Sequence, residues 1–312
     1  MSLSIRSLTE ADLDAAEQLR RLAFGTLFGL PDPLSFRGDA ALLRPRLGAF
    51  PGGGWVAEEF GELIGVAMAN HWGSLGLFGP VAVRPDHWRK GIARKLLEAT
   101  MPVFNHWGSR MVGLFTFPER PAHVRLYQSA GFWPRHLTAI MERPVTATAA
   151  KSPALSLAAP SADRTTLIRQ CATLTGSIWD GLDLSREIDL VLTQGLGDVL
   201  VLPEASQVVG FAICHTGKGS EGGSGEVYVK FAAVRPGTDA PARFTRLVAA
   251  CTEFADRRGA LQLAAGVNLG RMNAYRLMIE LGFRAVRQGV AMHRPWIEAY
   301  DRPEVFAIDD WR

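Results

Sequence analysis

Apolar residues in the first half of the chain fall into short runs whose spacing alternates between that of strands and that of helices. Two runs separated by Gly61-Glu62 predict a β-hairpin, and the next run is broken by Gly79-Pro80. The predicted strands are residues 5–8, 55–60, 63–68, 75–83, 111–117 and 133–141. The predicted helices are residues 9–23, 92–107 and 122–130. This order predicts a mixed β-sheet flanked by helices.

The second half of the chain repeats the first. Ala233-Val-Arg-Pro236 matches Ala82-Val-Arg-Pro85, and Leu281-Gly-Phe283 matches Ala130-Gly-Phe132, both at an offset of 151 residues. Equal spacing between two separate anchors is hard to obtain by chance. The sequence therefore predicts two tandem copies of one α/β fold of the α+β type, each with a mixed central sheet between helices.

Composition suggests where one copy ends and the next begins. Residues 146–161 are rich in Ala, Ser, Thr and Pro and lack periodicity, which is typical of a linker. We therefore assign residues 1–145 to the first domain, 162–296 to the second and 297–312 to a C-terminal tail. The tail mixes aromatic and acidic residues; it either packs on the surface or folds back onto a groove and contributes acids to an amine site. Five glycines within residues 217–225 predict a flexible loop.

The composition also limits the classes of function. The chain has 312 residues, of which 47% are hydrophobic, and its formal net charge of +3 is too small to argue for a nucleic acid or a membrane as partner. The sequence shows no signal-peptide core and no apolar run of about 18 residues. Cys171, Cys214 and Cys251 lie far apart without C-x-x-C spacing, as expected for buried side chains in a reducing compartment. These features predict a soluble cytoplasmic protein with no metal site.

The chemistry is expected in the turn between the strand at 75–83 and the helix at 92–107. A glycine at the helix start, Gly91, lets the backbone approach a ligand closely, and the first N–H groups of a helix have no intrahelical partner. Arg89, Lys90 and Arg94 add positive charge to the positive end of the helix dipole. The turn therefore predicts a phosphate or pyrophosphate site, although it matches neither common phosphate-loop motif.

The order of motifs resembles the GNAT superfamily of acyl-CoA-dependent N-acyltransferases. A Val-x-Pro strand end, a basic G-x-A turn, a long helix, a strand and then Leu126-Tyr-x-x-x-Gly-Phe132 follow one another at domain-like spacing. In that family the turn has the form (Gln/Arg)-x-x-Gly-x-(Gly/Ala), and its N–H groups hold the CoA pyrophosphate. Here Trp88-Arg-Lys-Gly-Ile-Ala93 fills it. Trp88 replaces the usual Gln or Arg, which removes one polar contact, while Arg89 keeps a cation available.

The resemblance also implies which residues bind acetyl-CoA, the one cofactor expected. They are Val81, Ala82, Val83, Trp88, Arg89, Lys90, Gly91, Ile92, Ala93 and Arg94. The strand end would hydrogen-bond the pantetheine arm, and Gly79-Pro80 is a natural place for the bulge that splays this strand. Tyr127 matches the tyrosine that acts as general acid toward the leaving thiolate in many family members. The alternative for Tyr127 is a core aromatic residue whose hydroxyl is satisfied locally.

The sequence does not identify a general base. The apolar strand at 75–83 carries no Glu or Asp, so a carboxylate base on that strand is absent. Five residues from neighbouring strand ends and a helix start are candidates, and each has a solvated or structural role as its alternative. They are Glu58, Glu59, His71, Glu119 and His123. A base that acts through a water molecule would leave no trace in the sequence.

The second copy lacks this chemistry. Its turn reads Ala242-Arg-Phe244, which replaces the glycine and puts bulk where the first copy allows close approach. The position of the tyrosine is taken by Met278, which cannot transfer a proton. The first copy is therefore expected to be the only catalytic one. The alternative is that the second copy binds a shorter anion through Arg243 and Arg246.

The leading hypothesis for function is an N-acetyltransferase that transfers the acetyl group of acetyl-CoA to a primary amine of a small molecule or peptide, by direct attack in a ternary complex. One alternative is a non-catalytic CoA-binding or sensing protein. Another is a scaffold in which the tandem copies serve only assembly. Because a tandem fusion can replace a homodimer, a monomer or weak homodimer is expected. The acceptor segments carry no motif, so the acceptor itself is not predicted.

Overall fold

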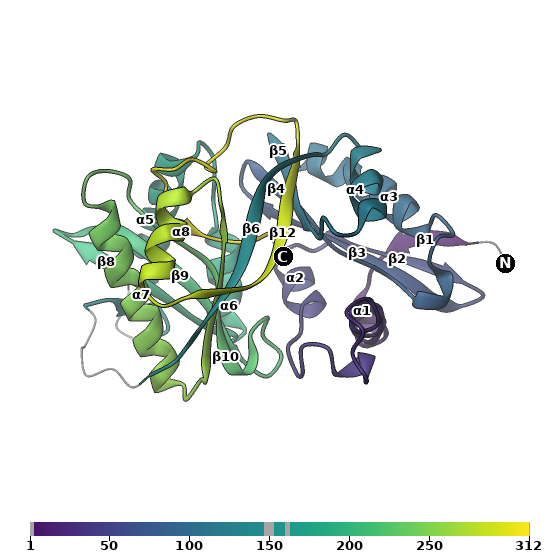
Figure 1. The fold of residues 1–312 in the computed structure, drawn as a ribbon, viewed down its shortest axis with the longest axis horizontal. Helices are drawn as coiled ribbons and strands as arrows, with labels where there is room; N and C mark the ends of the chain where they lie inside the picture. The colour runs from purple at the N-terminus through teal and green to yellow at the C-terminus, as the bar shows by residue number, and fades with distance from the viewer. Residues whose placement is uncertain (1–2, 147–152, 160–162, 312) are drawn as a thin grey trace.

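A computed structural model describes residues 3–146, 153–159 and 163–311. In these ranges thirteen strands form one sheet that runs through both halves of the chain (Figure 1). The strands are β1 (Ser4–Ser7), β2 (Gly54–Glu59), β3 (Glu62–Trp72), β4 (Leu75–Val83), β5 (Met111–Thr116), β6 (Trp133–Pro144), β7 (Leu155–Ser156), β8 (Gly197–Glu204), β9 (Gln207–Gly217), β10 (Gly223–Val234), β11 (Gln262–Asn268), β12 (Arg284–Arg294) and β13 (Ala307–Ile308). The helices are α1 (Leu13–Leu27), α2 (Leu43–Ala49), α3 (Ile92–His106), α4 (Pro121–Gln128), α5 (Arg164–Ile178), α6 (Ser185–Thr193), α7 (Ala240–Arg257) and α8 (Met272–Glu280).

The strand registers confirm the internal repeat. In the first half β4 and β5 pair in parallel over Leu75–Leu77 and 111–113. In the second half β10 and β11 pair in parallel over 226–228 and 262–264, at the same offset of 151 residues. The prediction of two tandem mixed α/β copies is therefore correct.

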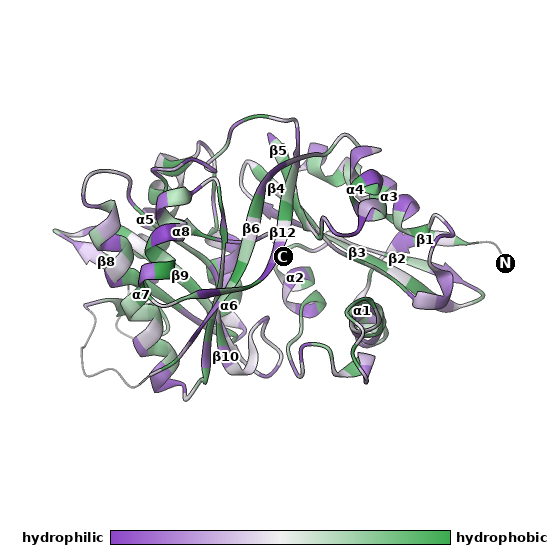
Figure 2. Ribbon diagram, in the orientation of Figure 1, coloured by the Kyte–Doolittle hydropathy of each residue, from purple (hydrophilic) through white to green (hydrophobic). Residues whose placement is uncertain are grey.

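Helices cover both faces of the first half because alternate residues of each strand point to opposite faces. In β3, Val66 and Met68 pack with α1 and α2. Their neighbours Ala67 and Ala69 pack with α3 on the other face. Figure 2 shows hydrophobic residues along the central strands, with hydrophilic segments on the outer helices α3 and α4.

The two halves exchange their last strands, which the sequence did not predict. β12 lies between β5 and β6, and β6 lies between β12 and β11. Val290 and Met292 of β12 are buried in the core beneath α3. In return, Ala139 and Met141 of β6 are buried in the core beneath α7. Each half therefore completes the core of the other, and the strands β6 and β12 cross the middle of the molecule (Figure 1).

Two expectations about irregular segments need correction. Within the predicted linker, Leu155–Ser156 form the edge strand β7, and Leu157 is fully buried, because this short piece covers the end of the sheet. The linker prediction for residues 147–152 and 160–161 concerns positions outside the described residues. The glycine-rich loop at 217–225 is not free either, since its Glu221 forms a buried ion pair with Arg46 of α2 at 3.0 Å.

The last part of the tail, residues 305–311, is also buried rather than laid on the surface. Its strand β13 pairs with β10, and Asp309 and Asp310 are 1% and 2% exposed. The described chain ends near the middle of the molecule, whereas its first strand, β1, lies toward one far end (Figure 1). Packing on the surface, one of the two expected arrangements, is therefore excluded for these residues.

Cys171, Cys214 and Cys251 are buried thiols, as expected. Among the helices in the described part of the chain, none combines the length and the apolar run that a bilayer crossing requires.

Candidate active site

The centre of the first half contains an unpaired strand edge. β4 and β5 pair only as far as Leu77 and Gly113, and beyond this point the two strands separate. A register shift between β3 and β4 falls at Gly79-Pro80, as the sequence predicted for the bulge. Residues 81–83 pair with β3 on one side. Their other edge faces the gap and has no strand partner among the described residues.

The backbone at the start of α3 forms an open turn beside this edge. Gly91 is the N-cap of α3 and has φ +80°, a left-handed conformation that L side chains rarely adopt. A Cβ atom at Gly91 would meet no other atom within 4 Å. Glycine is therefore needed here for its backbone angle, and the space in front of the first N–H groups of α3 is open to a ligand.

The cations of the turn differ in their partners. Arg94 forms an ion pair with Glu98 at 2.9 Å, one helical turn along α3. Arg89 and Lys90 are exposed and form no ion pair with a described residue. Their charges therefore remain available to an anion at the start of the helix.

Trp88 has a contact that sequence reasoning missed. Its indole N–H donates a hydrogen bond to the backbone carbonyl of Val83 at 2.7 Å. Trp88 was expected only to remove a polar contact, but through this hydrogen bond it connects the turn to the end of β4. The missed signal is the polar N–H of tryptophan, which usually finds a partner when partly buried.

A cavity of about 1020 Å³ joins the strand edge, the turn and the second half of the chain. Every residue predicted to bind acetyl-CoA lines it except Lys90. Other parts of the cavity are lined by residues of α1, the loop that follows it, β5, β6 and the second half. They include Arg20, Phe24, Phe28, Phe36, Arg37, Phe115, Phe117, Glu142, Glu221, Tyr228, Arg287 and Trp311.

Tyr127 lies in α4 at the wall of this cavity and is 7% exposed. Its ring packs edge-on against Phe78 and Phe132, with ring centroids 6.2 and 6.4 Å away. Burial raises the pKa of the Tyr127 hydroxyl above its usual value, and a side-chain hydrogen bond with Thr116 acts in the opposite direction. The hydroxyl is therefore protonated at neutral pH.

Two of the five candidate bases reach the cavity, namely Glu119 and His123. Burial lowers the pKa of His123, Arg120 lowers it further and Glu119 opposes the shift. His123 is therefore neutral at pH 7 and able to accept a proton.

The other three candidates have structural partners and do not line the cavity. Glu58 accepts a hydrogen bond from Arg6 at 2.9 Å. Glu59 lies 3.4 Å from Nε2 of His87. His71 packs against the ring of Trp107 with centroids 5.3 Å apart. Their positions support the structural alternative that the sequence left open.

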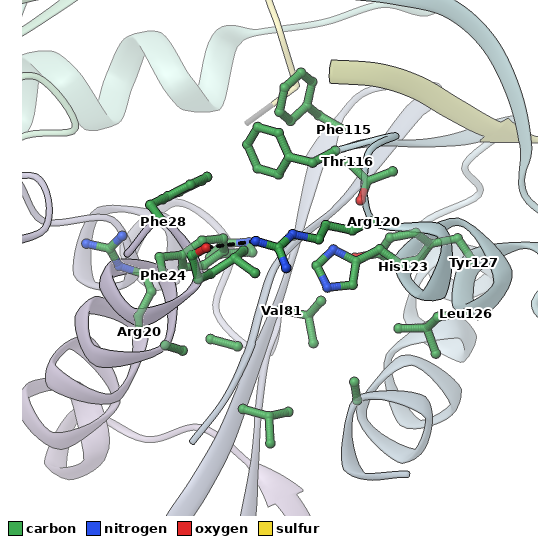
Figure 3. Close-up of a pocket in the computed structure, with 18 of the residues that line it drawn as sticks. Arg20, Phe24, Phe28, Val81, Phe115, Thr116, Arg120, His123, Leu126 and Tyr127 are labelled. Atoms are coloured by element: carbon green, nitrogen blue, oxygen red, sulfur yellow. Dashed lines mark hydrogen bonds between the residues drawn. The ribbon is translucent and has the colours of Figure 1, made fainter. Parts of the chain in front are cut away.

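Figure 3 shows how the two walls of the cavity face each other. Phe24 of α1 and Phe28, which directly follows this helix, lie on one side, and His123 and Tyr127 of α4 lie on the other. Arg120 reaches across from the start of α4 and donates a hydrogen bond to the Leu27 carbonyl at 3.1 Å.

Sequence reasoning missed the aromatic wall. Phe24, Phe28 and Phe36 stack with centroids 5.6 to 6.4 Å apart, and Phe117 meets Phe28 edge-on at 5.3 Å. The guanidinium of Arg287 lies 3.9 Å above the ring of Phe28. Phe24 and Phe28 are four residues apart, which places them on one helix face, and this spacing was the available signal.

In the part of the second half that the structure describes, no open turn corresponds to the one at Gly91. α7 begins at Ala240, so the residues that correspond to the glycine turn form the first turn of the helix itself. Arg243 and Arg246 both pair with Glu204, Arg243 at 2.7 Å. Arg243 also lies 3.5 Å from Asp239, so two carboxylates offset the two guanidinium groups, which argues against an anion site at these two residues. Met278, at the position of Tyr127, is fully buried.

Comparison with known proteins agrees with this geometry. A family model described as "Acetyltransferase (GNAT) family" matches residues 15–132. A putative acetyltransferase from Pyrococcus horikoshii has a similar structure, with a TM-score of 0.70 and 14% identity over 99% of this chain and 95% of that one. A GCN5-related N-acetyltransferase from Sphaerobacter thermophilus is similar with a TM-score of 0.63 and 16% identity, over 96% of this chain and 98% of that one. A tandem GNAT protein from the clavulanic acid biosynthesis pathway is similar with a TM-score of 0.60 and 13% identity, over 94% of this chain and 98% of that one.

No protein with a curated description matched the sequence. At these identities the structural likenesses establish the fold, and the family model establishes the first domain. The chain has two domains of the GNAT fold, and the first of them matches the acetyltransferase family model over residues 15–132.

Proposed function

We propose that the protein is an acetyl-CoA-dependent N-acetyltransferase whose active site lies in the first domain. The observation that carries this proposal is one cavity that joins three features: the unpaired edge of residues 81–83, the open turn at Gly91 and the protonated hydroxyl of Tyr127. Acetyl-CoA supplies the acetyl group as a reactive thioester. The second domain supports the cavity without binding a second acetyl-CoA.

The residues of the chain have separate tasks in this proposal. The backbone of Val81 to Val83 aligns the pantetheine arm as an added strand, and one of its N–H groups faces the acetyl oxygen. The turn from Trp88 to Ala93 binds the pyrophosphate. Among the described residues there is no group of three or more His, Cys, Asp or Glu side chains placed to hold a metal ion.

The transfer moves two protons and exchanges one bond for another. A C–N bond forms between the amine and the acetyl carbon while the C–S bond breaks. His123 or Glu119 takes the proton that the amine must lose, directly or through a water molecule. Tyr127 gives its proton to the sulfur of the leaving thiolate. Both proton-transfer groups lie on the same wall of the cavity (Figure 3).

The acceptor is a primary amine of a small molecule or peptide with an apolar body. The wall opposite Tyr127 is built from stacked phenylalanines of α1 and the following loop, together with Phe117. Such a surface favours apolar or aromatic groups. We further propose a cytoplasmic protein that acts as a monomer or weak homodimer, because strand exchange already joins two copies of the fold in one chain.

Calorimetric titration with acetyl-CoA tests the proposal. One site per chain is expected in the natural protein, and Gly91→Asp should abolish binding by adding a like charge at the pyrophosphate turn. Gly61→Asp is the matched control, because Gly61 has φ +82° and open space around it but lies in the β2–β3 turn. Two sites would refute the inactive second copy. Absence of binding to the natural protein would leave only the scaffold alternative.

A further inference from the structure

The strand edge that is free in the first half is occupied in the second half. After Tyr228, β10 and β11 separate just as β4 and β5 do after Leu77. In the gap, Ala232 and Ala233 pair with Ile308 and Ala307 of β13. At the offset of 151, Ala232 and Ala233 correspond to residues 81 and 82.

The same correspondence extends to the next backbone amide. The N–H of Val234 donates to the Phe306 carbonyl at 3.2 Å. Its counterpart, the N–H of Val83, faces away from β3, because the following residue, Arg84, is the one that donates to Ile64 of β3. In the second half, the chain itself accepts the hydrogen bond of the Val234 amide. In the first half, the corresponding Val83 amide is left for a ligand.

We propose that residues 305–311, the tail segment, take in the second half the place that the pantetheine arm takes in the first, and that this anchoring makes Trp311 a specificity-determining wall of the acceptor site. The inference rests on the proposed function, because it assigns residues 81–83 to the pantetheine arm.

The tail segment is anchored by buried polar contacts beyond β13. Arg271 donates to the Asp309 carboxylate at 2.9 Å, with both side chains almost fully buried. Tyr228 donates from its hydroxyl to Asp310 at 3.0 Å. The residue beneath Asp310 is Gly266, where a Cβ atom would lie 2.3 Å from the Asp310 side chain. The segment is therefore fitted into the second half rather than loosely attached.

This anchoring delivers Trp311 to the first half. The Trp311 indole N–H donates to the hydroxyl of Tyr300 at 3.0 Å. Its ring lies against β5, where a Cβ atom on Gly113 would come within 2.7 Å of it. Trp311 lines the active-site cavity together with Phe115, which lies two residues after Gly113 on the same face of β5. The size of this indole therefore limits the size of the acceptor.

The tail segment also forms part of the space where the second half would hold a pyrophosphate. A pocket of about 460 Å³ lies beside Gly237 and Pro241, and Phe306 and Glu304 form part of its wall. Glu304, which precedes the tail segment, lines this pocket with Glu280 and Arg276, so two carboxylates outnumber one guanidinium group and oppose an anion. The second half is thus closed to acetyl-CoA by its own chain as well as by its altered turn.

Hydrogen exchange read amide by amide tests the first part of the proposal without knowledge of the acceptor. The Val234 amide should be protected in the free protein, while the Val83 amide should become protected only when acetyl-CoA is added. An unprotected Val234 amide would overturn the tail assignment. A Val83 amide that exchanges equally with and without acetyl-CoA would instead count against the proposed function.

Steady-state kinetics tests the role of Trp311. Methylamine, butylamine, 2-phenylethylamine and 2-naphthylethylamine serve as acceptors, with thiol release as the readout and binding of the same amines to the CoA-loaded protein by NMR as a second readout. In Trp311→Ala the ratio of kcat/KM, or of affinity, for the largest over the smallest amine should rise by about 10-fold or more. Trp311→Phe should give an intermediate ratio, and the acetyl-CoA Kd should stay the same.

The matched control is Trp296→Ala, because Trp296 is 57% exposed and does not line the cavity. A ratio unchanged from the natural protein in both Trp311 variants would overturn the proposal while leaving acetyl-CoA binding intact. If Trp311→Ala does not fold, the Trp311→Phe ratio decides. Failure of the natural protein to bind any of the amines would count against the cavity as an amine site and so against both proposals.

Discussion

Replacing Tyr127 with phenylalanine removes the proposed proton donor and little else. The ring keeps its edge-on contacts with Phe78 and Phe132, so packing is preserved. The loss of the hydrogen bond with Thr116 should cost about 1 kcal/mol of unfolding free energy. A positioned general acid contributes roughly 10² to 10⁴ in rate, and the lower limit corresponds to about 2.7 kcal/mol of activation free energy. We therefore expect kcat to fall by about 100-fold or more, with the acetyl-CoA Kd unchanged.

The pH profile gives a second view of the same hydroxyl. Burial raises the pKa of Tyr127, so the hydroxyl keeps its proton beyond the usual tyrosine value of about 10. The natural enzyme should therefore show no loss of kcat from Tyr127 ionisation below about pH 10.

The assay is stopped-flow thiol release at saturating acetyl-CoA, paired with calorimetric Kd values. Tyr275→Phe is the matched control, because Tyr275 is half-buried in α8 and does not line the cavity. An unchanged kcat in Tyr127→Phe, with chemistry shown to limit the rate, would refute the proton-donor role. It would leave Tyr127 as a core residue.

Three further predictions concern stability, the base and the turn. Glu221→Gln should lower the unfolding free energy by about 3 kcal/mol, because it removes the buried carboxylate that Arg46 and Lys230 share, while Lys230 keeps its ion pair with Glu187 at 3.1 Å. At about 2.1 cal/mol/K per residue this is a Tm loss of about 5 °C, and calorimetry showing less than about 2 °C would contradict it. Burial raises the pKa of Glu221 but Arg46 and Lys230 lower it more, so its stabilisation should be present above about pH 4.5 and be lost as pH falls below that value. If His123 is the base, kcat/KM should fall on the acid side with an apparent pKa below 6.5, and His123→Gln should remove that limb of the profile. Arg89→Gln should weaken acetyl-CoA binding several-fold at low salt and less at high salt, and a salt-independent loss would argue against a charge effect.

Much of the site could be predicted because its signals are local. The turn at Gly91 needs a left-handed glycine, the first amides of a helix lack partners, and cations follow one another along a few residues. Each of these requirements involves only residues within one short segment of the chain. The same holds for the repeat, since a fixed offset of 151 residues is visible without any tertiary structure. Tyr127 was predicted from its position in the family pattern. In the structure its ring is buried against Phe78.

The acceptor wall could be predicted only in part. Phe24 and Phe28 had the spacing of one helix face, but nothing in the sequence placed Phe117 against Phe28. Likewise, the five glycines at 217–225 suggested a flexible loop, whereas Glu221 within it pairs with Arg46, 175 residues away in the chain. Ion pairs between distant segments carry no sequence signal, because any carboxylate and any guanidinium satisfy the same chemistry.

The sequence by itself determined the fold class, the two copies and the difference in their turns, because periodicity, glycine conformation and charge are properties of neighbouring residues. Only the tertiary structure decided that β6 and β12 change places and that β13 fills the edge of β10. Pairing between strands uses backbone N–H and C=O groups that all residues except proline share, so the choice of partner strand is not encoded locally. It is decided by which apolar faces are buried once the whole chain has folded.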